Sequence, residues 1–188
     1  MKMAFKTTVK DGLAELVLDK PPVNAFDSKE WFEMARLFRE LGDNAEANVV
    51  LCRNEGKGFC AGVDIKELQA DSSRIVEVNR GCYEAFAAIH ECRVPVIMAV
   101  AGFCLGGGIG MVGSADIIVA SEDATFGLPE IDRGAMGAAT HLARMFPVQK
   151  VRRMFFTGEP IGAAEAYRLG AVESLHPRDE LAGAARQL

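Results

Sequence analysis

The sequence predicts an α/β fold in which helices cover a largely parallel sheet. Short apolar runs with strand character alternate with longer amphipathic segments, and this alternation is typical of layered α/β folds. One buried apolar run, 95–101, leads to the glycine-rich stretch Gly106-Gly107-Gly108-Ile109-Gly110. The composition, 49% hydrophobic and 25% charged among 188 residues, is that of a globular chain long enough to bury one core.

The N-terminal part of the chain predicts a hairpin followed by a helix. Residues Thr7–Val9 and Leu13–Leu18 are strand-like and flank an Asp-Gly turn, which is a signal for a β-hairpin. A helix is expected over 28–41, where apolar residues recur at helical spacing. Asp27 and Glu30 stand at the positions of a capping box, so they fix where that helix begins.

The rest of the chain continues the alternation. Its expected elements are, in order, a strand over Val49–Cys52, a helix near Arg74–Glu91, the strand Pro95–Ala101, a helix opened by the glycine run, and strands over Asp116–Ala120 and Thr125–Gly127. From Gly137 onward the pattern is helical, with breaks at Pro147, Gly158 and Gly170 and a short strand near Val172–Leu175.

Charge and cysteine usage exclude several classes of protein. A formal net charge of −5 argues against a nucleic-acid-binding protein, which normally presents a basic face. The odd number of cysteines and the lack of a CxxC pair predict free thiols in a reducing, cytoplasmic compartment. His90, His141 and His176 lack the spacing of metal ligands, so we expect no metal site.

One segment tests whether the chain enters a membrane. Val94–Ala115 carries no charge and is long enough to cross a bilayer as a helix. However, it contains Pro95 and six glycines and lacks the flanking Trp and Tyr of a membrane span. A strand, a glycine turn and a buried helix explain it better, and we expect no membrane partner.

The glycine run is the strongest chemical signal. A strand that leads through bare glycine into a helix leaves backbone N–H groups aimed at one point, where they stabilise a bound anion or an oxyanion formed during reaction. The run lacks the Gly-Lys-Ser/Thr of a phosphate-binding loop, and Met111 replaces the last glycine of a dinucleotide fingerprint. The chain also contains no GxSxG nucleophile motif.

A second glycine turn gives the first one a partner. Gly62 permits a sharp bend after the segment 58–60, and the small side chain of Ala61 allows close approach of another chain or a ligand. We expect its N–H groups to meet those of the glycine run around one carbonyl oxygen.

Four stretches of sequence carry a family resemblance. In order, they are 61–68 (AGVDIKEL), 99–108 (AVAGFCLGGG), 115–120 (ADIIVA) and 126–131 (FGLPEI), and 22–25 (PVNA) also fits. Together they resemble the crotonase (enoyl-CoA hydratase/isomerase) superfamily over nearly the whole chain. The motifs are specific to the superfamily but not to one reaction within it.

The resemblance implies a fold, a substrate and an assembly. It implies a crotonase-like spiral of ββα units in a single domain over 1–188, with the spiral core over about 1–135 and a helical C-terminal region over about 136–188. It also implies an acyl-CoA thioester substrate, no separate cofactor because coenzyme A is part of the substrate, and a homotrimer or a hexamer. Members of the family continue for several tens of residues past the position of Leu188, so the helical region is expected to be truncated.

Residue roles carry over position by position. The two oxyanion N–H groups fall on Val63 and Gly107. The positions expected to contact the acyl-CoA are Lys20, Val23, Ala61, Gly62, Asp64, Ile65, Gly106, Gly108 and Gly110. Two preorganised N–H donors stabilise the negative charge that develops on a thioester carbonyl, and loss of either one costs on the order of 3 kcal/mol.

Glu130 is the expected proton carrier. It stands at the family position for a catalytic carboxylate, at a strand-to-helix junction. Hydratases of the family place a second glutamate where this chain has Gly110, so a two-glutamate hydratase is not expected. Asp132 shares a face with Glu130 in an extended segment and diverges from it in a helix, so a catalytic pair and a solvated surface aspartate both stay open.

The expected function is therefore an acyl-CoA enzyme that stabilises a thioester enolate. Isomerisation of a double bond by one carboxylate is the leading interpretation. The alternatives are C–C bond hydrolysis of a β-keto-acyl-CoA, because 129–134 and 137–142 resemble a branch with that activity, and hydration by Glu130 with Asp132. A non-catalytic acyl-CoA-binding protein is the alternative outside enzymes.

Overall fold

A computed structural model describes residues 4–188, with the side chain of Arg133 excepted. Its strands are β1 (Phe5–Lys10), β2 (Leu13–Leu18), β3 (Ala25–Phe26), β4 (Val49–Asn54), β5 (Gly58–Cys60), β6 (Gly62–Val63), β7 (Val96–Val100), β8 (Phe103–Leu105), β9 (Ile117–Ser121), β10 (Thr125–Gly127), β11 (Ile161–Gly162) and β12 (Ser174–His176). Its helices are α1 (Ser28–Asp43), α2 (Ile65–Ala70), α3 (Ile75–His90), α4 (Gly107–Val112), α5 (Ala139–Met145), α6 (Val148–Thr157), α7 (Ala163–Arg168) and α8 (Leu181–Ala185), with 3-10 turns η1 (Ser72–Arg74) and η2 (Pro129–Arg133).

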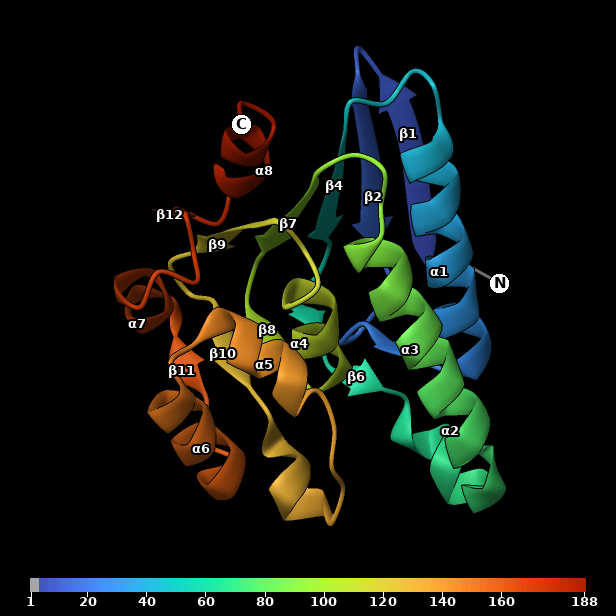
Figure 1. Cartoon of the computed structure of the whole chain (residues 1–188), viewed down its shortest axis with the longest axis vertical. Helices are drawn as coiled ribbons and strands as arrows, with labels where there is room; N and C mark the ends of the chain where they lie inside the picture. Colours follow the sequence, from blue (N-terminus) through green and yellow to red (C-terminus); the bar gives the residue numbers. More distant parts are fainter. Residues whose placement is uncertain (1–3) are drawn as a thin grey trace.

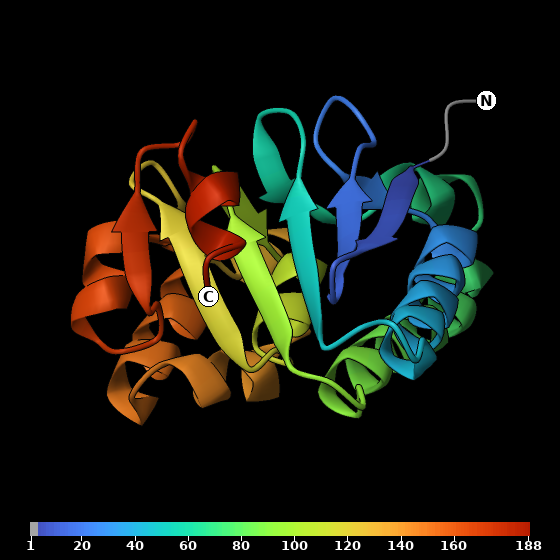
Figure 2. The same ribbon diagram turned by 90° about the horizontal axis from the view of Figure 1, so that it is seen from above.

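The main sheet has the strand order β1-β2-β4-β7-β9-β12. The hairpin β1–β2 is antiparallel, and every later pair in the sheet is parallel. Figure 2 shows these strands side by side, with most of the helices beneath them. The predicted α/β class and largely parallel sheet are confirmed.

Both faces of the central strands are buried, and each face packs against different helices. Val50, Met98 and Ala120 point into the large core that contains the buried residues of α1 and α3. Ile97 and Val119 point to the opposite face, where Leu181 and Ala185 of α8 cover them. Parallel strands covered on both faces read as continuous apolar runs, which explains the pattern of 95–101.

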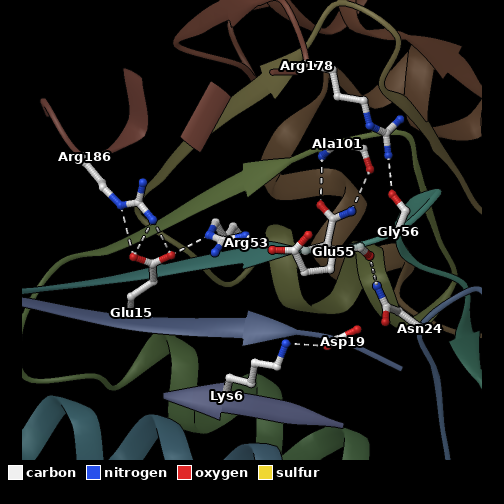
Figure 3. Close-up of polar contacts among 11 residues, drawn as sticks. Lys6, Glu15, Asp19, Asn24, Arg53, Glu55, Gly56, Ala101, Arg178 and Arg186 are labelled. Atoms are coloured by element: carbon white, nitrogen blue, oxygen red, sulfur yellow. Dashed lines mark hydrogen bonds and ion pairs between the residues drawn. The ribbon is translucent and has the colours of Figure 1, made fainter. Parts of the chain in front are cut away.

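Two arginines on the buried carboxylate of Glu15 fasten α8 to the sheet. Arg186, just after α8, donates to both carboxylate oxygens of Glu15 on β2 at 2.8–3.1 Å, and Arg53 of β4 pairs with the same carboxylate (Figure 3). Burial alone would raise the pKa of Glu15, but the hydrogen bonds from Arg53 and Arg186 outweigh it and lower that pKa. This contact joins the two ends of the chain.

Short strands form two smaller sheets and carry the functional turns. One sheet has the order β11-β10-β8-β5, and β3 pairs with β6. The sequence did not predict β3, β5, β6, β8 or β11, because strands of two or three residues carry no measurable periodicity. The expectation that the glycine run directly follows the strand at 95–101 was wrong, since Gly102 (φ +71°) turns the chain and β8 intervenes.

Other boundaries differ only slightly from expectation. The capping box of Asp27 and Glu30 is present at the start of α1. The C-terminal strand is shifted from 172–175 to β12, and α3 begins at Ile75 after the turn η1. The uncharged segment 94–115 is divided among β7, β8 and α4, and within residues 4–188 no helix combines the length and apolar character needed to cross a bilayer.

Candidate active site

The two glycine turns meet in direct backbone contact. A Cβ atom added to Gly62 would lie 2.9 Å from the amide nitrogen of Gly107, and one added to Gly107 would lie 3.4 Å from the Cα of Gly62. Gly62 also has a φ of +87°, a conformation that L side chains rarely adopt. Glycine at position 62 is therefore required both by backbone conformation and by the close approach of the second turn.

The backbone geometry determines which amides of the two turns the secondary structure uses. The Asp64 N–H donates to the carbonyl of Phe26 on the neighbouring strand β3 at 2.8 Å. Successive amides of a strand point to opposite sides, so the Val63 N–H points away from β3. Gly107 is the first residue of α4, and the first N–H groups of a helix have no acceptor within it.

Buried side chains pack directly against the backbone of the glycine run. The six-membered ring of Trp31 lies 2.8–2.9 Å from where a Gly107 Cβ would stand. Cys60 and Cys104, which are partners in the β5–β8 pairing, lie 3.0–3.1 Å from where a Gly108 Cβ would stand. Any side chain at either position would displace these groups, so the run is glycine because its backbone lies directly on the core.

Glu130 projects its carboxylate at the glycine run from η2. Its Oε1 atom lies 2.8 Å from where a Cβ of Gly106 would stand, and its Oε2 atom is buried without a hydrogen-bond partner in the part of the chain that the structure describes. Burial raises the pKa of Glu130 above its usual value. A buried carboxyl group with a raised pKa and an unpartnered oxygen can serve as a general acid and base.

Asp132 lies elsewhere. Residues two apart in a 3-10 helix differ in direction by about 120°, and Glu130 and Asp132 both belong to η2. The Oδ2 atom of Asp132 lies 3.2 Å from where a Cβ of Gly158 would stand, at the end of α6, and the residue is exposed. The structure therefore brings Glu130, and not Asp132, to the glycine run.

Phe86 fills the space that a side chain at position 110 would need. A Cβ atom added to Gly110 would lie only 2.1 Å from the Cζ atom of the Phe86 ring. Phe86 comes from α3, which packs beside α4 (Figure 1). Gly110 thus lies under an aromatic ring, and a second carboxylate has no room there unless Phe86 moves.

Several of the residues expected to hold the acyl-CoA lie along the first turn. The Ala61 N–H donates to the carbonyl of Val23 at 3.2 Å. The Lys20 ammonium lies 2.5 Å from a carboxylate oxygen of Glu30 and 3.8 Å from one of Asp64. Ile65, the first residue of α2, is half exposed. The structure brings these residues to one edge of the site, where the Lys20 ammonium lies between two carboxylates.

Asn24 organises this edge, although no individual role was predicted for it. It is buried with a φ of +52°, and its side-chain amide donates to the carbonyl of Gly58 at 2.9 Å and to that of Glu55 at 3.2 Å, the second of which Figure 3 shows. Its Oδ1 atom accepts the Lys20 N–H at 2.7 Å. The sequence signal that could have indicated this role is an asparagine just after Pro21-Pro22, because asparagine tolerates the left-handed backbone region.

Within residues 4–188, no three His, Cys, Asp or Glu side chains form a group that could hold a metal ion. The five cysteines are free. Burial raises the pKa of the Cys60 thiol to about 12, so it stays protonated and acts as a packing group and hydrogen-bond acceptor.

Comparison with known proteins identifies relatives of this arrangement. The family model for enoyl-CoA hydratase/isomerase matches residues 8–188. A protein of Rhodococcus jostii (strain RHA1) named (7aS)-7a-methyl-1,5-dioxo-2,3,5,6,7,7a-hexahydro-1H-indene-carboxyl-CoA hydrolase is 51% identical over 97% of this chain and 71% of its own length. A protein of the same name from Mycobacterium tuberculosis (strain ATCC 25618 / H37Rv) is 52% identical over 95% of this chain and 73% of its own.

More distant relatives have other names. The carnitinyl-CoA dehydratase of Proteus mirabilis (strain HI4320) is 30% identical over the whole of this chain and 74% of its own length. Among solved structures, the enoyl-CoA hydratase of Mycobacterium smegmatis has a TM-score of 0.93 at 26% identity and covers 99% of this chain and 75% of that one. The chain therefore spans roughly three quarters of the length of the proteins it matches.

Proposed function

Because the chain belongs to the enoyl-CoA hydratase/isomerase family, we propose that it hydrolyses a carbon–carbon bond next to a ketone in the acyl part of a coenzyme A thioester. The family consists of enzymes, and its members named above act on CoA thioesters. The observation that carries the proposal is the single carboxyl group of Glu130, buried, partly unpartnered and aimed at the glycine run. In this proposal, the backbone N–H groups of Val63 and Gly107 donate hydrogen bonds to the oxyanion that forms on the substrate.

The proposed reaction uses one carboxylate twice. Ionised Glu130 takes a proton from the water that attacks the ketone, and the resulting tetrahedral centre collapses with cleavage of the adjacent C–C bond. The electron pair of that bond passes to the thioester as an enolate, and the former ketone becomes a carboxylic acid. Protonated Glu130 then returns its proton to the carbon that was cleaved, so atoms and charge balance and no second carboxylate is required.

The glycine run stabilises the enolate. Negative charge on the thioester oxygen meets the N–H groups of Val63 and Gly107, whose positions are fixed before the reaction by the contact of Gly62 with Gly107. Lys20, Val23, Ala61, Asp64 and Ile65 hold the coenzyme A part of the substrate in this proposal. No further cofactor enters, and a homotrimer or hexamer in the cytoplasm remains part of the proposal through the family resemblance.

The relatives favour hydrolysis over isomerisation. Both proteins that are about half identical to this chain are named hydrolases of a bicyclic diketone bearing a carboxyl-CoA group. Double-bond isomerisation, the leading interpretation of the sequence, is the second candidate, because it too uses one carboxylate and needs no group at Gly110. Hydration by Glu130 with Asp132 draws no support from the geometry, since Asp132 lies beside Gly158.

The test follows the fate of the thioester. Purified protein is incubated in ¹⁸O-water with a cyclic β-keto-acyl-CoA and, separately, with trans-2- and cis-3-enoyl-CoA. Ring hydrolysis gives a product heavier by one water, with ¹⁸O in a new carboxyl group and no free thiol released. Isomerisation leaves the mass of the enoyl-CoA unchanged, and thioester hydrolysis releases coenzyme A.

Two variants of the same turn complete the test. Glu130→Gln is expected to abolish ring hydrolysis, whereas Asp132→Asn, which alters an exposed carboxylate two residues away, is the matched control and is expected to retain it. The proposal fails if Glu130→Gln retains full turnover or if the wild type converts only the enoyl thioesters.

A further inference from the structure

Trp31 of α1 is fully buried, although its ring nitrogen has no hydrogen-bond partner within residues 4–188. It is the single tryptophan of the chain. Folded proteins pair nearly all buried N–H groups, so this exception calls for an explanation. A phenylalanine or a leucine would fill the core without burying an N–H group, so the stability of the core alone does not account for a tryptophan here.

The outer edge of the Trp31 ring lies directly against Gly107. Its Cζ2 and Cη2 atoms are 2.8 and 2.9 Å from where a Gly107 Cβ would stand. Gly107 is the first residue of α4 and carries one of the two proposed oxyanion donors. No side chain separates the backbone of Gly107 from the ring, so a shorter ring would leave an empty space into which this backbone could move.

The same ring packs against the strand that holds the other donor. Phe26 of β3 meets Trp31 edge-on, with ring centroids 5.6 Å apart and an interplanar angle of 81°. Phe26 is the register partner of Val63 in the pairing of β3 with β6, and its carbonyl accepts the Asp64 N–H at 2.8 Å. Trp31 therefore lies between the strand that orients Val63 and the turn that carries Gly107.

Helix α3 prevents Trp31 from moving away from Gly107. Figure 1 shows α1 and α3 side by side, and a Cβ atom added to Gly81 of α3 would lie only 2.9 Å from the Cβ of Trp31. Phe86, also on α3, packs edge-on against the Trp31 ring with centroids 5.7 Å apart. The base of the side chain and two sides of its ring are thus fixed by close packing, which leaves the indole one position.

Two donors stabilise one oxyanion only when both lie within hydrogen-bond distance of the same oxygen atom. We infer that Trp31 is a positioning residue, whose ring length sets the place of the Gly107 amide relative to the Val63 amide. An indole reaches further from its Cβ than a phenyl ring or a leucine side chain does. This reach explains why the chain has a tryptophan at position 31 although the ring nitrogen is left without a partner.

This inference rests on the proposed function, and the test separates the two. The probes are hexanoyl-CoA and S-hexyl-CoA, which differ only in having a carbonyl or a methylene group beside the sulfur. Neither carries the ketone or the double bond that the candidate reactions require, so binding is measured by calorimetry without turnover. The wild-type protein is expected to bind the thioester about tenfold more tightly, because only the thioester offers an oxygen to the two donors. This ratio of Kd values is the carbonyl preference.

Three variants of α1 test the role of ring length. Trp31→Leu is expected to lose the carbonyl preference while S-hexyl-CoA binds as it does to wild type. Trp31→Phe keeps a shorter ring and is expected to retain a preference of about threefold. Phe38→Leu removes another fully buried ring, two helical turns further along the same face, and is the matched control that is expected to keep the full preference.

Kinetics give a second measurement. Trp31→Leu is expected to lower kcat for ring hydrolysis by about 10²-fold with little change in KM, because a displaced donor acts mainly on the charge that develops during reaction. Phe38→Leu is expected to leave both parameters close to those of wild type.

A full carbonyl preference in Trp31→Leu, or an equal loss of affinity for both probes, would overturn the role of Trp31. An equal loss of preference in Phe38→Leu would overturn it as well, since the effect would then follow from core packing in general. If Trp31→Leu does not fold, a full preference in Trp31→Phe overturns it. Equal affinity of wild type for the two probes, or binding of neither, would instead count against the proposed donors and coenzyme A substrate.

Discussion

The Sγ atom of Cys60 accepts a hydrogen bond from the N–H of Gly62 at 3.3 Å, inside the core and directly behind the site. The same residue touches the second glycine turn, because its Cβ and carbonyl oxygen each lie 3.0 Å from where a Gly108 Cβ would stand. Cys60 therefore links the two turns that carry the oxyanion donors. It orients the Gly62 amide inward, which leaves the next amide, that of Val63, pointing outward.

Replacing Cys60 is expected to impair turnover more than binding. Cys60→Ala removes the acceptor for the Gly62 N–H, so the Val63 amide is less well aligned, and kcat is expected to fall roughly tenfold with a small change in KM. Cys60→Ser keeps an acceptor and is expected to recover part of the rate. Cys52→Ala, which removes another fully buried thiol, on β4, is the control. Equal kinetic losses in Cys60→Ala and Cys52→Ala would mean that packing alone matters.

Glu130 is expected to reduce stability as the pH rises. Its pKa is raised in the folded protein, so the folded state binds more protons than the unfolded state between the usual pKa near 4.5 and the raised one. Stability is then lost as pH rises through the folded-state value. The Glu130→Gln protein is expected to unfold at a higher temperature than wild type at neutral pH, although its turnover falls 10²–10⁴-fold.

The test compares thermal melting curves of the wild-type and Glu130→Gln proteins at several pH values. The difference in Tm between the two proteins is expected to shrink toward acid pH, where wild-type Glu130 is protonated in both folded and unfolded states. Asp132→Asn provides the matched baseline. A difference in Tm that does not vary with pH would contradict the burial of a titrating carboxyl group at position 130.

The contact between Phe86 and Gly110 predicts a strong coupling between the two positions. Gly110→Ala places a Cβ atom 2.1 Å from the Phe86 ring and is expected to lower the free energy of unfolding by about 1–3 kcal/mol. Phe86→Ala opens that space, so the double variant is expected to be more stable than the sum of the single effects predicts. Additive effects, measured by denaturant unfolding, would mean that the ring does not occupy this space.

The same contact predicts how a second carboxylate could be introduced. Gly110→Glu alone is expected to fold poorly, whereas Gly110→Glu combined with Phe86→Ala has room for the new side chain on the face of α4 that Phe86 covers. The double variant is expected to gain the ability to hydrate trans-2-enoyl-CoA. The measurement is the loss of the enoyl-thioester absorbance. Phe86→Ala alone is the control and is expected to show no such gain.

Glu67 is expected to stabilise the protein above acid pH. Its carboxylate accepts from the backbone N–H of Ser28 at 2.8 Å and from the Ser28 hydroxyl at 2.6 Å, and Arg74 donates to it at 3.1–3.2 Å. Burial alone would raise the pKa of Glu67, but these hydrogen bonds outweigh it and lower that pKa. The contribution is present above the unfolded-state pKa and is lost as pH falls through the lower folded-state value.

The change that tests this contact is Glu67→Ala. It leaves the Ser28 N–H at the start of α1 unpaired, and we expect a loss of about 1–3 kcal/mol in the free energy of unfolding at neutral pH, shrinking at acid pH. Glu77→Ala, which removes a more exposed carboxylate that also pairs with Arg74, is the control. A loss from Glu77→Ala as large as that from Glu67→Ala would point to Arg74, and not to the cap on α1, as the source.

Sequence alone determined the features that depend on neighbouring residues. The hairpin, α1 with its capping box, the buried strands and the two glycine turns follow from periodicity, caps and conformational preference, all of which act over a few residues. The order of the four motifs along the chain was sufficient to identify the family.

Tertiary structure decided which of these features meet. Three contacts join segments that are distant in the chain: Gly62 with Gly107, the ring of Phe86 with Gly110, and His141 with Phe86. The divergence of Asp132 from Glu130 depends on how the turn η2 is wound. Such contacts are set by packing density and by where buried polar atoms find partners. Those quantities belong to the folded chain as a whole, so no local pattern contains them.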